Sequence, residues 1–348
     1  MPLKIICIEE HATDKGLKEA AWPELARQAS YLADYGITFQ DDPEAHANGM
    51  PQCEAPRRAE EIEAAPMAAR IPEMDEFGID MQVLSYPIYC QYAPVEAAVA
   101  GIRAANDRMA SAVAQHPDRF AGFSLLPWQS PEHAIAEIER SAGELGLTGT
   151  MLAGLPAVDT FLDHPRFAPI LEKLEALQVP LYLHPGPPMR DVQRLYFSGF
   201  ENEVTNRLSM FSWGFHHEAG LQVVRLIVSG VLDRFPGLKI ISGHLGEMVP
   251  YYLHRLDETL PIALTGLSRS ILQTYRDQVF VTPSGMLNTA HMMFLREVVG
   301  ADRIIFSMDY PWMTLTGARA WLEGLPITEA EREAIAHGNA EKLLRLRA

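Results

Sequence analysis

Four hydrophobic runs in this sequence each lead into side chains that can bind a metal ion. The last run, Ile304–Phe306, is followed by Asp309 and then by Pro311. A buried strand that delivers a carboxylate at its C-terminal tip is how a parallel barrel presents a catalytic residue. We therefore predict that the four strand tips converge on one metal ion. The other three tips read Glu9-Glu10-His11, His184-Pro185 and Gly243-His244.

The predicted ligand set combines imidazole and carboxylate groups. Side chains alternate along a strand, so Glu9 and His11 would share one face of the first strand tip, with Glu10 on the other face. His184 would come from the fifth strand and Asp309 from the eighth. Taken singly, each residue has an ordinary structural explanation, so the prediction depends on the set. Two imidazoles and two carboxylates suit Zn²⁺ or Mn²⁺, with Mg²⁺ as a further candidate.

Helical segments alternate with short hydrophobic runs along the whole chain. Parallel neighbours in a sheet need crossover connections, so this alternation predicts a parallel sheet. Eight such units close most simply into a (β/α)₈ barrel. An open, doubly wound sheet is the alternative, but no G-x-G-x-x-G follows the first strand and no P-loop is present. The predicted strands cover residues 4–9, 81–86, 120–126, 149–153, 179–184, 238–243, 279–282 and 303–307.

A length of 348 residues lies within the range of one barrel with insertions, so we predict a single domain over residues 1–348. Residues from about 13 to 56 are polar and irregular, and we expect them to form an insertion over the barrel mouth. One helical piece is predicted within it, over residues 24–33. Further along, helices are predicted over residues 58–77 and 221–235.

Composition excludes several classes of protein. The hydrophobic fraction of 48% is ample for a core, but no apolar run reaches the ~18 residues of a membrane span. The first residues enter a strand almost at once, so we expect no signal peptide. A net charge of −16 disfavours nucleic acids and anionic membranes as partners. Three cysteines without a C-x-x-C pair predict reduced thiols in a cytoplasmic protein.

The motifs at these strand ends resemble those of the amidohydrolase superfamily. Within it, the chain is similar to the non-oxidative aromatic acid decarboxylases of γ-resorcylate (2,6-dihydroxybenzoate), 2,3-dihydroxybenzoate and 5-carboxyvanillate. The resemblance covers essentially the whole chain and is weakest over residues 13–56. Binuclear barrel metallohydrolases carry a carboxylated lysine at the tip of strand four, where this chain has Ala153-Gly154, so a mononuclear site is expected. The matching segments are Glu9-Glu10-His11, Leu183-His184-Pro185, Gly243-His244-Leu245-Gly246-Glu247 and Phe306-Ser307-Met308-Asp309-Tyr310-Pro311.

The resemblance implies a role for each matching residue. Asp309 would deliver a proton to the ring as well as bind the metal, which requires a suitably tuned pKa. His244, paired with Glu247, would orient the phenolic oxygen or shuttle protons. The ligands of one divalent metal ion would be Glu9, His11, His184 and Asp309.

Two arginines are implied as substrate contacts. Arg255 would bind the substrate of a neighbouring subunit, which implies a homo-oligomer such as a dimer or tetramer. Arg58, or Arg57 beside it, would match a further arginine that binds the carboxylate. The implied partner is a small aromatic carboxylate.

The predicted activity is removal of carbon dioxide from a hydroxylated benzoate, such as 2,6- or 2,3-dihydroxybenzoate. Protonating the ring carbon first avoids an aryl carbanion, and a metal stabilises charge on the substrate oxygens. The main alternative is a hydrolase or hydratase of a lactone, amide or unsaturated dicarboxylate, in which His244 activates a water. A non-catalytic binding protein is disfavoured, because all four ligand positions hold competent residues. His216 and His217, after an aromatic run, are interpreted chiefly as a helix cap and a surface residue, with a place in the pocket lining as the alternative.

Overall fold

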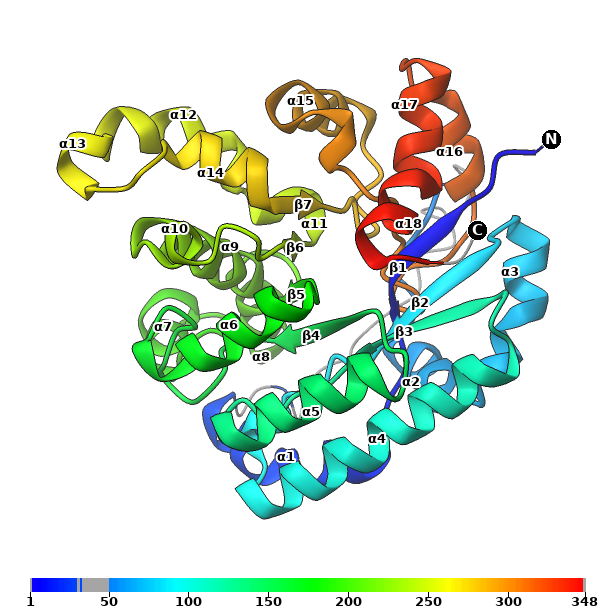
Figure 1. The fold of residues 1–348 in the computed structure, drawn as a ribbon. Helices are drawn as coiled ribbons and strands as arrows, with labels where there is room; N and C mark the ends of the chain where they lie inside the picture. The colour runs from blue at the N-terminus through cyan, green and yellow to red at the C-terminus, as the bar shows by residue number, and fades with distance from the viewer. Residues whose placement is uncertain (1, 30–31, 33–49, 347–348) are drawn as a thin grey trace.

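The structure is a computed structural model and describes residues 2–29, 32 and 50–346. Seven parallel strands are hydrogen-bonded to one another in sequence order. In Figure 1 they form a curved sheet at the centre of the molecule, with helices around its outside. The predicted α/β barrel class is therefore confirmed. The strands are β1 (Ile6–His11), β2 (Met81–Ser85), β3 (Phe120–Ser124), β4 (Gly149–Ala153), β5 (Leu181–His184), β6 (Ile240–Ser242) and β7 (Val279–Val281).

The predicted eighth strand, residues 303–307, is not a regular strand. The amide of Ile305 donates to the carbonyl of Val281 at 2.9 Å, but the next amide, of Phe306, donates to the carbonyl of Ile335 instead. A backbone group that pairs outside the sheet interrupts the ladder, because each amide has one proton to donate. The segment still lies between β7 and β1 and closes the ring. Two single parallel bridges hold it there, Val281–Ile304 and Glu10–Tyr310.

Helices cover the outside of the strands, and none in the described part of the chain has the length and hydrophobicity of a membrane span. The principal helices are α1 (Lys15–Gln28), α2 (Pro56–Ala64), α3 (Ile71–Phe77), α4 (Val95–Gln115), α5 (Pro131–Gly143), α6 (Ala168–Leu177), α8 (Asn202–Ser209), α9 (Gly214–Val228), α12 (Val249–Thr259), α14 (Ile271–Gln278) and α15 (Thr289–Val299). Shorter helices are α7 (Arg190–Val192), α10 (Val231–Arg234), α11 (His244–Glu247), α13 (Ile262–Thr265), α16 (Ala318–Gly324), α17 (Glu329–Glu333) and α18 (Asn339–Leu344).

Three predicted helices have different bounds. The helix predicted over 58–77 is divided into α2 and α3, because Pro66 and Pro72 cannot donate the backbone hydrogen bonds of a continuous helix. The helix predicted over 221–235 begins earlier, at Gly214, and is divided at Gly230, whose φ is +75°. The helix predicted over 24–33 is α1, and residues 30–31 and 33–49 of the predicted insertion lie outside the described residues.

The barrel interior is apolar below the strand tips. Hydrophobic side chains from successive strands pack against one another there. Helix α18 contributes Ala340 and Leu344 to the same cluster. The strand residues of this cluster include Ile6, Ile8, Val83, Phe123, Met151, Tyr182, Ile241 and Phe280, with Ile305 from the eighth segment.

The buried carboxylate of Glu10 joins the eighth segment to the sheet. Its oxygens accept hydrogen bonds from the amide of Met308 at 3.0 Å and from Nε2 of Gln82 at 3.2 Å. Replacing Glu10 by Ala leaves both buried donors unpaired, so we expect the free energy of unfolding to fall by about 2–4 kcal/mol. Urea unfolding followed by circular dichroism measures this. Glu19→Ala, on the exposed face of α1, is the control, and equal midpoints for the two variants would contradict the prediction.

Candidate metal centre

The four side chains predicted as ligands meet at the carboxyl ends of the strands. Each offers one ligand atom, and these atoms all lie within 4.8 Å of one another. His11 Nε2 is 2.9 Å from Asp309 Oδ1. His184 Nε2 is 3.7 Å from Glu9 Oε1. Only the side chain of Asp309 is noticeably exposed, at 18%, so the group is open on one side.

The remaining polar atoms of these residues show that the group fits a metal ion. His184 Nδ1 lies 2.8 Å from the carbonyl oxygen of Pro185, which can only accept, so the lone pair of His184 is on Nε2 and faces the centre. His11 Nδ1 lies 3.0 Å from Ser85 Oγ. Glu9 Oε1 is buried and has no hydrogen-bond partner among the described residues. The two imidazoles are each held by the protein through Nδ1, which leaves Nε2 facing the centre. A cation at the centre would satisfy Glu9 Oε1 and these two nitrogens.

Three hydroxyl groups hold the other oxygen of Glu9. Tyr182 and Ser284 both donate to Oε2, and Thr282 Oγ1 lies 3.4 Å from the same atom. These residues were not singled out in the sequence. A signal was present for Tyr182, since it precedes His184 by two positions and so shares its inward face of β5.

Burial decides the charge states of the ligands. It raises the pKa of Glu9 to about 7, although the positive charge of His244 opposes the shift. It lowers the pKa of His184 to about 3, which keeps this imidazole in the neutral form that binds metals. Burial would also raise the pKa of Asp309, but the adjacent imidazoles of His11 and His244 hold it well below its usual range.

The predicted pairing of His244 with Glu247 is present. His244 Nδ1 lies 2.7 Å from Glu247 Oε1, and its Nε2 lies 3.5 Å from Asp309 Oδ2. Burial would lower the pKa of His244, but the charge of Glu247 raises it well above its usual value. His216 Nδ1 contacts the second oxygen of Glu247 at 2.8 Å. Trp213, not His216, occupies the N-cap position of α9, so the helix-cap interpretation was wrong, and His216 lines a cavity at the site, as the alternative interpretation had it.

The backbone is unusual where these side chains leave it. Non-glycine residues rarely adopt positive φ, and such residues cluster at functional sites. The segment labelled α11, His244–Glu247, is a turn with non-helical backbone angles and not a regular helix. Gly246 lies within this turn with φ +79°, and a Cβ there would be 2.6 Å from the hydroxyl of Tyr275. The turn directs His244 and Glu247 into the barrel mouth together. The non-glycine residues with positive φ at the site are His244, Leu245, Glu247, Met248, Ser284 and Asp309.

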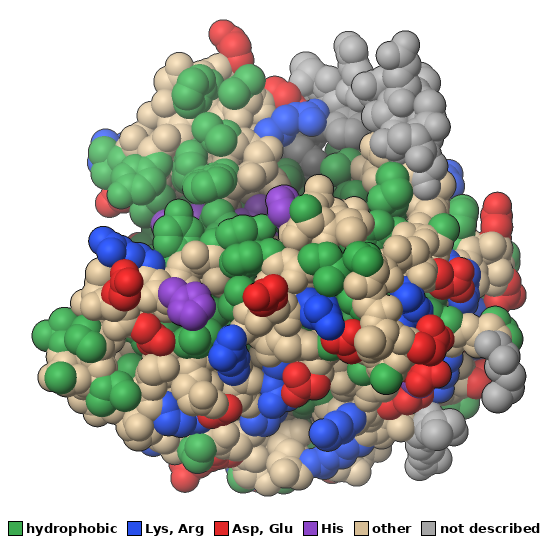
Figure 2. Space-filling view, turned by 90° about the horizontal axis from the view of Figure 1, so that it is seen from above, with side chains coloured by type: hydrophobic (Ala, Val, Ile, Leu, Met, Phe, Trp, Pro, Cys, Tyr) green, Lys and Arg blue, Asp and Glu red, His purple; other side chains and the backbone are tan. Residues whose placement is uncertain are grey.

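Two adjoining cavities open from the metal group, with volumes of about 480 Å³ and 220 Å³. Figure 2 shows histidine side chains within a hollow that hydrophobic side chains flank. Aromatic rings form much of the cavity wall, and the rings of Phe211 and Trp312 are stacked at 6.3 Å. Such walls suit a flat aromatic molecule with polar substituents directed at the metal group. The residues that line both cavities are Phe211, Phe215, His244, Asp309 and Trp312.

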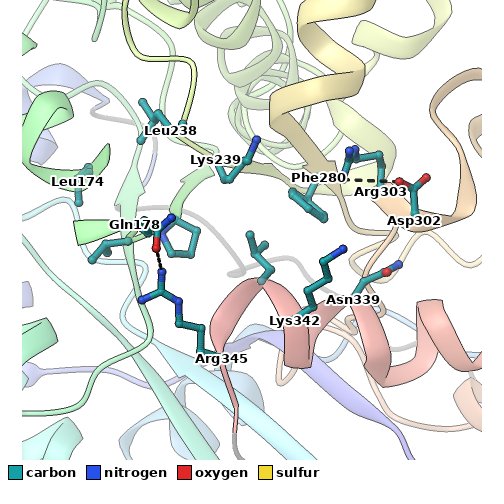
Figure 3. Close-up of a pocket in the computed structure, with 14 residues that line it drawn as sticks. Leu174, Gln178, Leu238, Lys239, Phe280, Asp302, Arg303, Asn339, Lys342 and Arg345 are labelled. Atoms are coloured by element: carbon teal, nitrogen blue, oxygen red, sulfur yellow. Dashed lines mark hydrogen bonds and ion pairs between the residues drawn. The ribbon is translucent and has the colours of Figure 1, made fainter. Parts of the chain in front are cut away.

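A third cavity, of about 400 Å³, lies at the opposite end of the barrel (Figure 3). Lys239 precedes β6 and Arg303 is the first residue of the eighth segment, so the cavity is at the amino ends of the strands. Its lining contains one carboxylate, Asp302, and no histidine or cysteine. It therefore does not contain the metal group.

The two predicted arginines lie outside the lining of the two cavities at the site. Arg255 is on α12 with its side chain 71% exposed, and its Nη1 lies 3.2 Å from Glu258. Arg58 is on α2 with its side chain 63% exposed, and its Nε lies 3.1 Å from Glu54. Their predicted contacts with a substrate stay predictions.

Comparison with known proteins agrees with this geometry. The amidohydrolase family model matches residues 22–346. A γ-resorcylate decarboxylase of Polaromonas sp. is 36% identical over 288 residues, which cover 80% of this chain and 86% of that protein. The 5-carboxyvanillate decarboxylase of Sphingomonas paucimobilis has a similar structure, with a TM-score of 0.83, 31% identity, and coverage of 99% of this chain and 100% of that chain.

A dihydroxybenzoic acid decarboxylase of Polaromonas sp., solved with manganese and 2-nitroresorcinol, is also similar. Its TM-score is 0.81 at 31% identity, with coverage of 100% of this chain and 98% of that chain. The chain thus belongs to the amidohydrolase family. Its resemblance to the aromatic acid decarboxylases within that family is confirmed.

The hydroxyl of Tyr182 should matter for metal affinity. Tyr182→Phe removes a hydrogen bond that orients Glu9, and loss of such a contact typically weakens metal binding by about 10–100-fold. Calorimetric titration of the metal-free protein with Mn²⁺ measures the change. Tyr275→Phe is the matched control, because the buried hydroxyl of Tyr275 has no hydrogen-bond partner among the described residues. Equal affinities for both variants would show that Tyr182 does not orient the ligand.

Proposed function

We propose that this chain is a metal-dependent, non-oxidative decarboxylase of a hydroxylated benzoate, such as 2,6- or 2,3-dihydroxybenzoate. The observation that carries the proposal is a group of four side chains that could bind a metal ion, beside a cavity with aromatic walls at the open end of an amidohydrolase barrel. The activities of the similar proteins support it, since they are decarboxylases of γ-resorcylate, dihydroxybenzoic acid and 5-carboxyvanillate.

The proposed cofactor is one divalent ion, held by Glu9, His11, His184 and Asp309. Mn²⁺ is the first choice because a similar structure contains it, and Zn²⁺ and Mg²⁺ are the alternatives. When bound, the ion supplies Lewis acidity that stabilises negative charge on the carboxylate and phenolic oxygens of the substrate.

The order of steps follows from the chemistry of the ring. Direct loss of carbon dioxide would leave an unstable aryl carbanion, so the ring carbon that bears the carboxylate is protonated first. Asp309 lines both cavities and is the proposed proton donor. Breaking the bond to the carboxyl carbon then returns its electron pair to the ring and restores aromaticity.

The charge states suggest how the proton reaches Asp309. Two adjacent imidazoles hold the pKa of Asp309 low, so Asp309 keeps a proton only briefly. His244 is the proton reservoir, because Glu247 raises its pKa and its Nε2 lies 3.5 Å from Asp309 Oδ2. In this proposal Asp309 donates the proton to the ring and His244 then reprotonates Asp309, as general acid catalysis requires.

The proposal includes a homo-oligomer, a dimer or a tetramer, in which Arg255 contacts the substrate of a neighbouring subunit. Large hydrophobic side chains are exposed on the same helix and on the next, as expected of a protein–protein interface. A cytoplasmic location is also proposed, where the free cysteines would stay reduced. The exposed hydrophobic residues are Tyr251 and Tyr252 on α12, with Ile262 and Leu264 on α13.

Asp309→Asn tests the proton donor. An amide cannot supply a proton to the ring, so we expect a loss of about 10²–10⁴-fold in kcat. The Mn²⁺-loaded protein is incubated with a panel of ortho-hydroxybenzoates, and ring absorbance and carbon dioxide release are followed. Metal content is measured in parallel, because Asp309 is also a proposed ligand. Asp302→Asn, at the other end of the barrel, is the control.

Two results would count against this assignment. Near-normal turnover by metal-loaded Asp309→Asn would exclude Asp309 as the donor. Turnover of a lactone or an unsaturated dicarboxylate by the wild type, with none of any benzoate, would favour the hydrolase or hydratase alternative over the decarboxylase.

Arg255→Ala tests the contribution of a neighbouring subunit. An arginine that binds the substrate but takes no part in proton transfer should raise KM by about 10-fold or more and change kcat little. Mixing Arg255→Ala subunits with Asp309→Asn subunits should restore activity, because a mixed pair has one site with both side chains intact. Arg103→Ala, exposed on α4, is the control. Absence of recovery on mixing would refute sharing between subunits.

A further inference from the structure

His216 has contacts that a packing residue would not need. It lies in the first turn of α9, with its side chain 15% exposed to the larger cavity. Its ring packs between Phe215, at 4.3 Å between ring centroids, and His244, at 4.5 Å. Both of its nitrogens also have polar partners. Nδ1 lies 2.8 Å from Glu247 Oε2, and Nε2 lies 3.0 Å from the carbonyl oxygen of Phe211.

These two partners define where the protons are. A carbonyl oxygen only accepts hydrogen bonds, so Nε2 of His216 must carry a proton. Glu247 Oε2 also acts as an acceptor when that carboxyl group is ionised. Burial would raise the pKa of Glu247, but the charges of His244 and His216 lower it to about 2. Nδ1 of His216 lies 2.8 Å from Glu247 Oε2, and a carboxylate oxygen accepts, so the geometry points to a proton on Nδ1 as well.

Both oxygens of the Glu247 carboxylate consequently accept a hydrogen bond. Oε1 accepts from His244 Nδ1 at 2.7 Å, and Oε2 accepts from His216 Nδ1 at 2.8 Å. No part of this side chain is exposed, so water cannot replace either donor. If Oε2 lost its donor, the buried carboxylate could rotate about its last bond and release His244 from its position near Asp309.

We propose that His216 is a positioning residue: its Nδ1–H holds Oε2 of Glu247, its Nε2–H anchors the ring to the Phe211 carbonyl, and the fixed carboxylate keeps His244 directed at Asp309. The kinetic consequence of this rests on the proposed decarboxylase function, whereas the hydrogen-bond arrangement does not. His216 is not one of the four proposed ligands, but with His244 and Glu247 it forms a second group whose potential ligand atoms lie within 4.8 Å of one another, so Mn²⁺ content is measured in every variant.

Three substitutions of His216 separate its two contacts. Asn places an amide nitrogen near the position of Nδ1 and can still donate to Glu247. Gln places its amide nitrogen near the position of Nε2 and keeps only the contact with the Phe211 carbonyl. Phe keeps the ring and neither donor. His217→Asn, one position along and exposed, is the matched control.

We expect His216→Gln and His216→Phe to lower kcat by about 10–100-fold, the usual cost of losing an orienting partner, with KM and Mn²⁺ content unchanged. His216→Asn should retain most of the wild-type kcat, because it keeps the donor to Glu247. A purely structural role would not predict this difference from the Gln variant. Adding His216→Phe to Glu247→Gln should cause no further loss, because the first residue acts only through the second. Multiplied losses in the double variant, or a Gln variant more active than the Asn variant, would overturn the proposal.

A direct readout does not depend on turnover. In protein labelled with ¹⁵N-histidine, the His216 signals, assigned by their absence in His216→Asn, should show protons on both ring nitrogens. An unprotonated Nδ1 would overturn the proposal even if the kinetics agreed. A wild type that decarboxylates no benzoate but shows the doubly protonated ring would refute the proposed function and leave the role of His216 intact.

Discussion

The close approach of two carboxylates and two imidazoles, within 4.8 Å of one another, is the constraint on which the rest of the structure depends. Burial by itself disfavours every charged form in this group, as the raised pKa of Glu9 and the lowered pKa of His184 show. A divalent cation at the centre would reverse this balance, since it favours ionised carboxylates and neutral imidazoles. The surrounding side chains therefore have to present the ligands in metal-binding states and hold them against their mutual repulsion.

In three of these side chains, one polar atom contacts the protein and the other faces the centre of the site. One oxygen of Glu9 accepts from hydroxyl groups, and the other is directed inward. One nitrogen of His184 donates to a backbone carbonyl, and one nitrogen of His11 contacts Ser85, which leaves the second nitrogen of each facing the site. Glu247 repeats the pattern one layer further out, because each of its oxygens has its own histidine partner. Ligands fixed in this way need little reorganisation when they bind.

How far the sequence predicts this site depends on how local each signal is. The convergence of Glu9, His11, His184 and Asp309 was predictable, because strand alternation and the common edge of parallel strands are local rules that need no knowledge of packing. The contact between His216 and Glu247 was not, because it joins α9 to a turn after β6, and nothing in the spacing of either segment encodes their approach. The irregular eighth segment was also missed, since Phe306 pairs with Ile335, far along the chain. Its hydrophobic pattern alone indicates an ordinary buried strand.

The turn that carries His244 and Glu247 shows why the backbone path matters as much as the residue types. In a regular α-helix, residues three apart also share a face, so the spacing of this pair does not distinguish a helix from the observed turn. The observed turn instead contains successive residues with positive φ, each of which costs about 1–2 kcal/mol for a residue other than glycine. Such a conformation persists only where its surroundings over-determine it.

Gly246 packs against Tyr275, and the Leu245 amide donates to the Thr282 carbonyl at 2.8 Å. The turn is thereby tied to the end of β7, close to the hydroxyl group of Thr282 that faces Glu9. The same few residues thus fix His244, the proposed proton reservoir, relative to Glu9, a proposed metal ligand, which is the kind of preorganisation that the proposed reaction needs.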